Sequence, residues 1–320
     1  MNYSLLKLLI ACRSNIALTL FLFSLINFSN AISQEQEVDS KIRIQDSHGK
    51  WAFEQPPKKI AVINWTLTEQ LFELGVTPVA VADLTGFRAN SPQTTLPEKH
   101  NMIVDLGSRF SPNLELLKTT EPELIIIGYS QRDLMRPLSN IAPVMYFNNF
   151  SRRGDNLQRA DNHFLSLATL FDKSSFAQQK LTERDAKIFS LRDKLLSTFK
   201  QYNKAIPTVT TVSIKGNDIW AYLNGSIPYG VLTKLGVSPE LSEKPSKLGT
   251  HKLSNKQINE IQGCLLFINN SDMASSLPMK SKNKKESCYL QAEPANTFGG
   301  SISHLHLAES FTQALLKKFQ

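Results

Sequence analysis

The side chains that could carry out catalysis are too scattered in this sequence to form a recognisable active site. The closest pair of histidines, His304 and His306, is two residues apart, and such a pair faces different directions on a helix. The patterns G-x-x-x-x-G-K-[ST], G-x-S-x-G, H-E-x-x-H and C-x-x-C, which bind phosphate, present a nucleophile or bind a metal, are all missing. We therefore expect a binding protein rather than an enzyme, with no cofactor and no metal ion held by the protein itself.

The first 31 residues have the composition of a secretory signal peptide. They contain Lys7 and Arg13 and no acidic residue, followed by an apolar run over 16–26 that is too short to span a bilayer. The run ends in Ser29-Asn30-Ala31, which places small residues where signal peptidase requires them. We expect residues 1–31 to be removed on export.

Export changes the charge that bears on function. The whole chain has 36 basic and 28 acidic residues, a net charge of +8, and removing Lys7 and Arg13 lowers this to +6. An exported protein has no access to nucleic acid, so the surplus charge is better related to an anionic ligand. A lipoprotein signal at Cys12 is the alternative to a cleaved peptide, although Cys12 precedes the apolar run.

Export also changes the meaning of the remaining cysteines, Cys264 and Cys288. Disulfides persist outside the cytoplasm, and the apolar residues around both cysteines resemble strands. A disulfide between neighbouring strands is therefore one interpretation, and two separate buried thiols are the other.

The rest of the chain alternates short apolar strands with short helices, which is typical of mostly parallel sheets covered on both faces. An uninterrupted helical pattern without Gly or Pro covers 176–202. We expect an α/β protein of two lobes joined by this long helix, with a leader at 32–57, a first lobe at 58–150, a helical segment at 151–205 and a second lobe at 206–320. The expected strands cover 60–63, 78–82, 124–128, 144–147, 208–214, 219–223 and 264–268.

Several segments of the first lobe resemble a known family. They are 59–65 (KIAVINW), 69–83 (EQLFELGVTPVAVAD), 104–107 (VDLG), and 112–117 (PNLELL) followed by 122–126 (PELII). They are similar to periplasmic iron-siderophore binding proteins of the ferric-hydroxamate type, and the resemblance extends more thinly to about residue 318. It implies the class III periplasmic binding protein fold, a ligand cleft between the lobes and delivery to an inner-membrane ABC permease.

The resemblance also assigns ligand-binding residues. It places Arg88 and Tyr129 where the family's arginine and tyrosine donate hydrogen bonds to the siderophore oxygens that coordinate iron, and Trp65 on an aromatic wall of the cleft. A guanidinium and a phenol suit anionic oxygens, and a flat ring suits the apolar part of such a ligand. The alternatives are a surface ion pair for Arg88 and core positions for Tyr129 and Trp65.

The second lobe departs from the family pattern. Leu248 stands where the hydroxamate binders have a tryptophan, and Phe298 is all that remains of a group of aromatic residues near the C-terminus. These changes and the net charge of +6 favour a smaller or more polar, anionic siderophore.

The docking residues implied by the resemblance are also incomplete. The family uses one acidic residue per lobe to meet arginines of the permease. Asp133 can fill the first position, whereas Lys256 occupies the second, with Glu260 one helical turn away as a substitute.

The resulting hypothesis is a monomeric periplasmic protein that binds a ferric siderophore and delivers it to an ABC permease. Two alternatives remain open: a binding protein for another metal chelate such as haem or cobalamin, and a non-catalytic scaffold with a vestigial cleft.

Overall fold

The structure is a computed structural model that describes residues 41–151, 153–241, 248–268 and 288–319. Contacts within the chain group Ile42–Gln320 into one compact unit, which is the part considered below. The expected signal peptide, its cleavage site and Cys12 lie outside the described residues. Across the described ranges, no helix has both the length and the apolarity needed to cross a membrane.

The first sheet consists of five parallel strands in the order β5-β4-β3-β6-β7. Its central strands β3 and β6 are buried along their whole length, which explains their continuous apolar sequences. Separate core clusters cover its two faces. The strands are β3 (Ile60–Val62), β4 (Ala80–Val81), β5 (Val104–Asp105), β6 (Leu124–Gly128) and β7 (Val144–Phe147).

Short helices connect these strands, and three of them begin at a capping polar side chain. The Asn64 side chain accepts the Leu67 amide at the start of the first helix, and the Asp83 side chain accepts the Gly86 amide at the start of the second. The helices are α2 (Trp65–Glu73), α3 (Leu84–Asn90), η1 (His100–Met102), α4 (Leu114–Thr119), η2 (Tyr129–Leu134) and α5 (Met135–Ser139).

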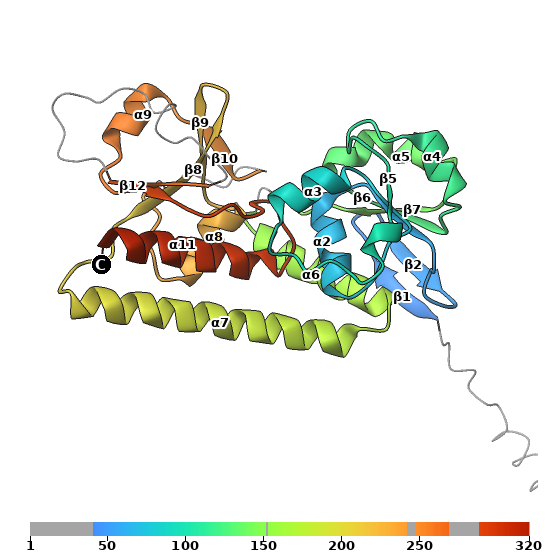
Figure 1. Ribbon diagram of the computed structural model, residues 1–320, viewed down its shortest axis with the longest axis horizontal. Helices are drawn as coiled ribbons and strands as arrows, with labels where there is room; N and C mark the ends of the chain where they lie inside the picture. Colours follow the sequence, from blue (N-terminus) through green and yellow to red (C-terminus); the bar gives the residue numbers. More distant parts are fainter. Residues whose placement is uncertain (1–40, 152, 242–247, 269–287, 320) are drawn as a thin grey trace, which may run out of the picture. The chain divides into compact units, whose positions relative to one another are not determined.

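The second sheet has the order β10-β9-β8-β11-β12 and is mixed. Strands β8, β11 and β12 are parallel, while β9 and β10 extend the sheet as antiparallel strands (Figure 1). The elements are β8 (Val209–Lys215), β9 (Asp218–Tyr222), α8 (Ile227–Lys234), β10 (Thr250–Lys252), α9 (Asn255–Glu260), β11 (Cys264–Phe267), β12 (Cys288–Gln291) and α11 (Ser303–Phe319).

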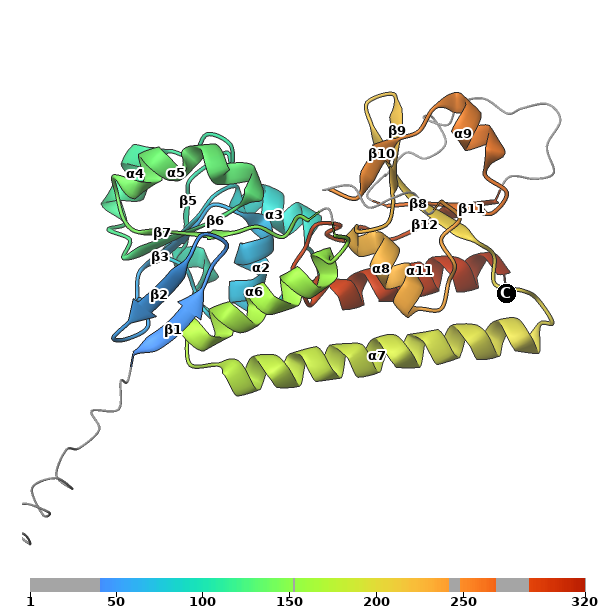
Figure 2. The same cartoon turned by 180° about the vertical axis from the view of Figure 1, so that it is seen from behind.

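The helices α6 (Asn156–Leu170) and α7 (Ser174–Gln201) connect the two sheets. Ala177 and Leu181, near the start of α7, belong to a core cluster of the first sheet, whereas Ile188 and Leu195 belong to a cluster of the second. One face of α7 thus contributes to both cores, and the helix lies alongside α11 (Figures 1 and 2). This arrangement confirms the prediction of two mostly parallel sheets joined by one long helix.

The leader, to which the sequence analysis assigned no element, contains an antiparallel hairpin. Strands β1 (Ile42–Gln45) and β2 (Lys50–Phe53) pair with each other, and Ile44 is buried in a core cluster of the first sheet. The hairpin packs on α6, and Asp46 in its turn accepts the amide of Tyr146, at 2.9 Å. Exposed residues alternate with more buried ones along both strands because one face of the hairpin remains exposed.

Cys264 and Cys288 form a disulfide. They are directly opposite each other in the parallel pair β11–β12. Of the two interpretations of these cysteines, the structure therefore has the bridge between neighbouring strands.

Candidate functional site

The carboxyl ends of the first sheet's parallel strands all open on the same edge, where ligands of α/β proteins bind. Asn64, Trp65 and Thr66 follow β3, Tyr129 follows β6, and Asn149 and Phe150 follow β7. Arg109 comes four residues after the end of β5. The fold thereby gathers at one edge side chains that are far apart in sequence.

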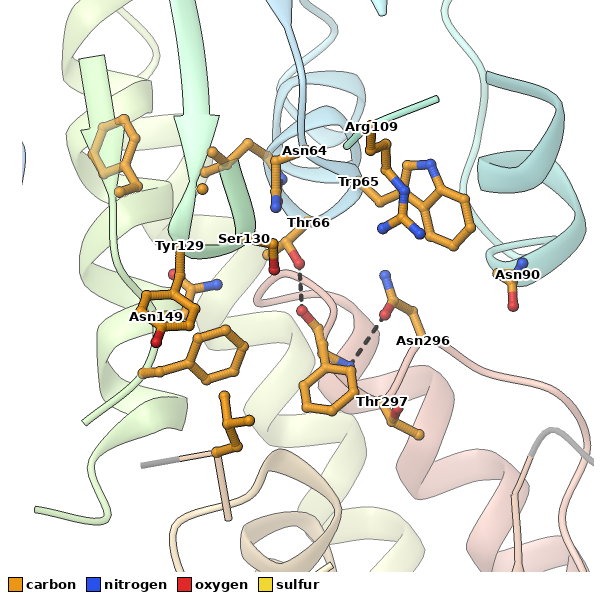
Figure 3. A pocket seen from close by; sticks show the side chains of 16 residues that line it. Asn64, Trp65, Thr66, Asn90, Arg109, Tyr129, Ser130, Asn149, Asn296 and Thr297 are labelled. Atoms are coloured by element: carbon orange, nitrogen blue, oxygen red, sulfur yellow. Dashed lines mark hydrogen bonds between the residues drawn. The ribbon is translucent and has the colours of Figure 1, made fainter. Parts of the chain in front are cut away.

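These side chains line a cavity of about 340 Å³. Trp65 and Arg109 lie on one side of it, Tyr129 and Asn149 on the other, with Asn296 and Thr297 completing the wall (Figure 3). The described lining residues are Asn64, Trp65, Thr66, Leu67, Asn90, Arg109, Gly128, Tyr129, Ser130, Phe147, Asn149, Phe150, Leu248, Asn296, Thr297 and Phe298.

The guanidinium group of Arg109 is held in place by two neighbours. Its central carbon lies 3.3 Å from the ring centroid of Trp65, and its Nε lies 3.4 Å from the Asp83 carboxylate. Burial lowers the pKa of Arg109, an effect that Asp83 opposes, and an arginine remains charged under such conditions. With Nε directed at Asp83, the Nη end is left to meet a ligand.

The Trp65 ring is itself fixed. Its Nε1 donates a hydrogen bond to the carbonyl of Asp83, at 2.9 Å. A Cβ at Gly86 would lie 2.7 Å from the ring, so the glycine makes room for it. The Trp65 ring and the Arg109 guanidinium that stacks on it are therefore held in a fixed arrangement.

Two asparagines lie at this edge of the sheet, one after β3 and one after β7. Asn64 donates to Gln131 Oε1 at 2.9 Å, and its own Oδ1 accepts the Leu67 amide, so its amide group is committed to the protein. Asn149 Oδ1 is hydrogen-bonded to Nδ1 of His163. Burial lowers the pKa of His163 to about 4, so the neutral ring donates from Nδ1 and leaves the Asn149 amino group for the cavity.

The opposite wall comes from the segment that follows β12. Phe298 donates its amide to Asn296 Oδ1, and Thr297 Oγ1 accepts from the hydroxyl of Tyr222 at 3.0 Å. Thr66 of α2 donates to the carbonyl of Phe298, so this wall is bonded to the first sheet's helix (Figure 3).

Aromatic rings form a row along the cavity. The rings of Tyr129 and Phe150 are 5.5 Å apart, those of Phe150 and Phe298 are 5.8 Å apart, and those of Phe298 and Tyr222 are 6.2 Å apart. The first two pairs have the edge-on geometry that aromatic rings favour. This row supplies a large apolar surface beside the polar groups.

Four of the five predicted ligand-binding residues line the cavity: Trp65, Tyr129, Leu248 and Phe298. Arg88 does not, because it lies in the last turn of α3 with its side chain exposed to solvent. Arg109, to which the sequence analysis assigned no role, lines the cavity, and it is the charged side chain among the described lining residues.

Sequence reasoning also missed Asn149 and Phe150. A signal was available for these two residues, since both closely follow the apolar strand β7 of the parallel sheet. Gly107, with a φ of 71°, makes the turn that precedes Arg109.

The residues predicted to dock on a permease are both on the surface. Asp133 is exposed in η2 beside Arg132, and Glu260 is exposed at the end of α9, 3.9 Å from Lys256 Nζ. The positive charge of Lys256 thus partly neutralises Glu260, which was proposed to replace the acidic residue missing at position 256.

The site can surround a compact ligand with oxygen atoms on one side and apolar surface on the other. Its polar groups donate hydrogen bonds from a guanidinium, a phenol and an amide. Within the described ranges, no group of three or more His, Cys, Asp or Glu residues could hold a bare metal ion.

Comparison with known proteins agrees with this geometry. A family model described as periplasmic binding protein matches residues 60–285. The ferric-anguibactin-binding protein FatB of Vibrio anguillarum is 25% identical over 79% of this chain and 78% of its own length. The iron(3+)-hydroxamate-binding protein FhuD of Escherichia coli is 28% identical over 57% of this chain and 58% of its own length.

Among solved structures, the siderophore-binding protein FhuD of Vibrio cholerae with bound Fe3+-Desferal is 30% identical, with a TM-score of 0.71. The match covers 82% of this chain and 99% of that one.

Proposed function

We propose, from the premise that this chain belongs to the periplasmic binding protein family, that it captures an iron(III)–siderophore complex in the cavity and delivers it to an inner-membrane ABC permease. The observation that carries the proposal is the cavity itself. It combines hydrogen-bond donors with an aromatic row, as a metal chelate with anionic oxygens and an apolar backbone requires. The iron would be coordinated by the siderophore alone, and the protein performs no catalysis.

The charge of the wall supports one class of siderophore. Arg109 is the charged side chain among the described lining residues, and its ion pair with Asp83 offsets much of its charge. A complex of three hydroxamates with iron(III) is electroneutral, whereas catecholate and citrate complexes carry several negative charges. Because buried charge must be balanced locally, we propose a hydroxamate complex of low net charge. The local wall thus favours a different ligand from the one that the chain's net charge of +6 suggested.

The remaining parts of the proposal concern location and partners. The chain would reach the periplasm through the signal peptide at 1–31, act as a monomer, and contact its permease through Asp133 and Glu260 at the rims of the two lobes. Rim charges of this kind chiefly affect the rate of encounter.

Tryptophan fluorescence tests the binding function. Trp65 lines the cavity, whereas Trp51 lies in β2 and Trp220 in β9. A ferric trihydroxamate should quench fluorescence saturably in the wild type and in a Trp51→Phe, Trp220→Phe double variant, and much less in Trp65→Phe.

The panel for this experiment is a ferric trihydroxamate, a ferric tricatecholate, ferric citrate and an iron(III) salt with a weak chelator. Tighter binding of the catecholate or citrate than of the hydroxamate would reject the proposed ligand class. No saturable quenching with any ferric siderophore would reject the function itself.

A further inference from the structure

We propose that Glu69 is a positioning residue that fixes the second wall of the cavity relative to the first. The inference rests on the proposed function, since it explains how that function obtains a preformed site. Glu69 lies on α2 and does not line the cavity. It acts through the segment 296–303, called here the wall segment, which contains Asn296, Thr297 and Phe298.

The carboxylate of Glu69 binds the wall segment at three points. Asn296 Nδ2 donates to Oε2 at 3.2 Å, the Gly300 amide donates to the same oxygen at 3.3 Å, and the Ser303 hydroxyl donates to Oε1. Glu69 is completely buried, as is the hydroxyl-bearing Ser303. One side chain from the first lobe thus receives donors from both ends of the segment.

The sequence of the wall segment fits this contact. A Cβ at Gly299 would lie 2.9 Å from Glu69 Oε2, and a Cβ at Gly300 would lie 2.6 Å from Gln70 Cγ. Only a backbone without side chains approaches α2 this closely. Thr66, one turn earlier on α2, donates to the carbonyl of Phe298.

The other end of the segment is held by α7. Arg184 is buried and donates from Nη1 to the carbonyl of Ser301 at 3.2 Å, while Asp161 of α6 accepts from both Nη1 and Nη2. This contact fixes the position of the wall segment at Ser301. The part that carries Asn296 is located by Glu69.

Removing the Glu69 carboxylate would leave buried hydrogen-bond donors without an acceptor. A buried amide or hydroxyl without an acceptor costs about 1–3 kcal/mol. Without the Glu69 carboxylate, the donors at Asn296, Gly300 and Ser303 would have to turn elsewhere, and Phe298 would move with them. The polar and aromatic contacts that these residues offer a ligand would then be lost from the site.

The test compares Glu69→Met with Glu69→Gln. Met has a similar length and no acceptor, whereas Gln keeps one oxygen for Asn296 and Gly300 and can donate to Ser303. Glu73→Met is the matched control: Glu73 lies on the same helix and pairs with Lys180 at 2.8 Å, away from the cavity. The dissociation constant of the ferric complex is measured by titration calorimetry, and amide hydrogen exchange of residues 296–303 is measured without ligand.

If Glu69 positions the wall segment, Glu69→Met should weaken binding of the ferric complex about tenfold and speed amide exchange at Gly300. Glu69→Gln should keep both quantities within about twofold of the wild type. Glu73→Met should lower the melting temperature and leave both measurements unchanged. A Glu69→Met protein that is less stable but binds and exchanges like the wild type would overturn the inference, because it would make Glu69 a stabilising residue only.

Two further measurements test the inference if Glu69→Met does not fold or if the wild type binds no ferric complex. If Glu69→Met does not fold, Ser303→Ala removes a single donor and should weaken binding about threefold; unchanged binding and exchange in that variant count against the inference. If the wild type binds no ferric complex, the proposed function fails, and hydrogen exchange of the unliganded variants still decides whether Glu69 holds the segment.

Discussion

Arg109 combines the features expected of an anion contact: a partly buried guanidinium, an aromatic ring beneath it and a carboxylate that orients its Nε end. Charge-assisted hydrogen bonds contribute about 1.5–3 kcal/mol, which corresponds to about 10- to 100-fold in affinity. We expect Arg109→Gln to weaken binding of a ferric siderophore by this factor, measured by fluorescence titration. Arg88→Gln is the matched control. Equal losses of affinity in the two variants would show that Arg109 is not the specific contact.

The buried carboxyl of Glu69 predicts a dependence of stability on pH. Burial raises its pKa from 4.5 to about 7, more strongly than its hydrogen bonds lower it. A raised pKa means that the folded protein holds the proton more tightly than the unfolded chain. This contribution is fully present below about pH 4.5 and is lost as the pH rises through about 7.

We therefore expect the wild type to lose free energy of unfolding relative to Glu69→Gln between pH 5 and pH 8, on the order of 3 kcal/mol. Urea unfolding of both proteins at the two pH values measures the difference. Burial lowers the pKa values of His163 and His304, which destabilises the fold in acid, but both proteins share that effect. A difference between the two proteins that does not change with pH would contradict the assignment.

The residues of the site differ in how well they could be predicted. Tyr129 directly follows the five-residue strand β6, and Trp65 comes three residues after the fully buried strand β3, so the position of each at the sheet edge can be inferred from the sequence. Arg109 follows β5, a strand of only two residues, and this gives little periodicity to detect. The resemblance to iron-siderophore binding proteins pointed to Arg88 and assigned no role to Arg109.

At the scale of elements, the disulfide links the edge strand β12 of the second sheet to its neighbour β11. Among the described strands, β12 lies at the edge of its sheet and pairs with β11, and the chain continues from β12 into the wall segment of the cavity. The bridge joins cysteines 24 residues apart, and a loop of that size corresponds to a stabilisation of about 3 kcal/mol.

Reduction should therefore lower the free energy of unfolding by about this amount. Urea titration with and without reductant measures it. The Cys264→Ser, Cys288→Ser double variant should match the reduced wild type and show no response to reductant. A wild type that is equally stable with and without reductant would contradict the prediction.

The long helix α7 was predictable, whereas several short elements were not. The pattern over 176–202 locates α7 to within two residues at its start and one at its end, because a continuous helix of 28 residues shows its period many times. The hairpin β1–β2 and the three-residue strand β10 have few buried positions and are stabilised by their packing and pairing partners. Their sequences alone therefore carry little signal.

At the scale of the whole molecule, the described cavity wall contains residues that follow strands of both sheets, but its hydrogen bonds connect it mainly to the first of them. Arg109, Tyr129 and Asn149 come from the first sheet's edge, and the wall segment, although it follows the second sheet, is hydrogen-bonded to α2. α7 contributes to the cores of both sheets. Such cross-connections favour a site that exists before the ligand arrives, which limits the entropy lost on binding.

The central claim is that this cavity binds a ferric siderophore as an intact complex. Isothermal titration calorimetry of the exported chain with a ferric trihydroxamate tests it most directly, with the iron-free siderophore and an iron(III) salt as parallel titrants. The account predicts one site per chain, a dissociation constant in the micromolar range or below for the ferric complex, and at least tenfold weaker binding by Arg109→Gln. Equal affinity for the iron(III) salt alone, or no binding of any ferric siderophore at millimolar concentration, would contradict it.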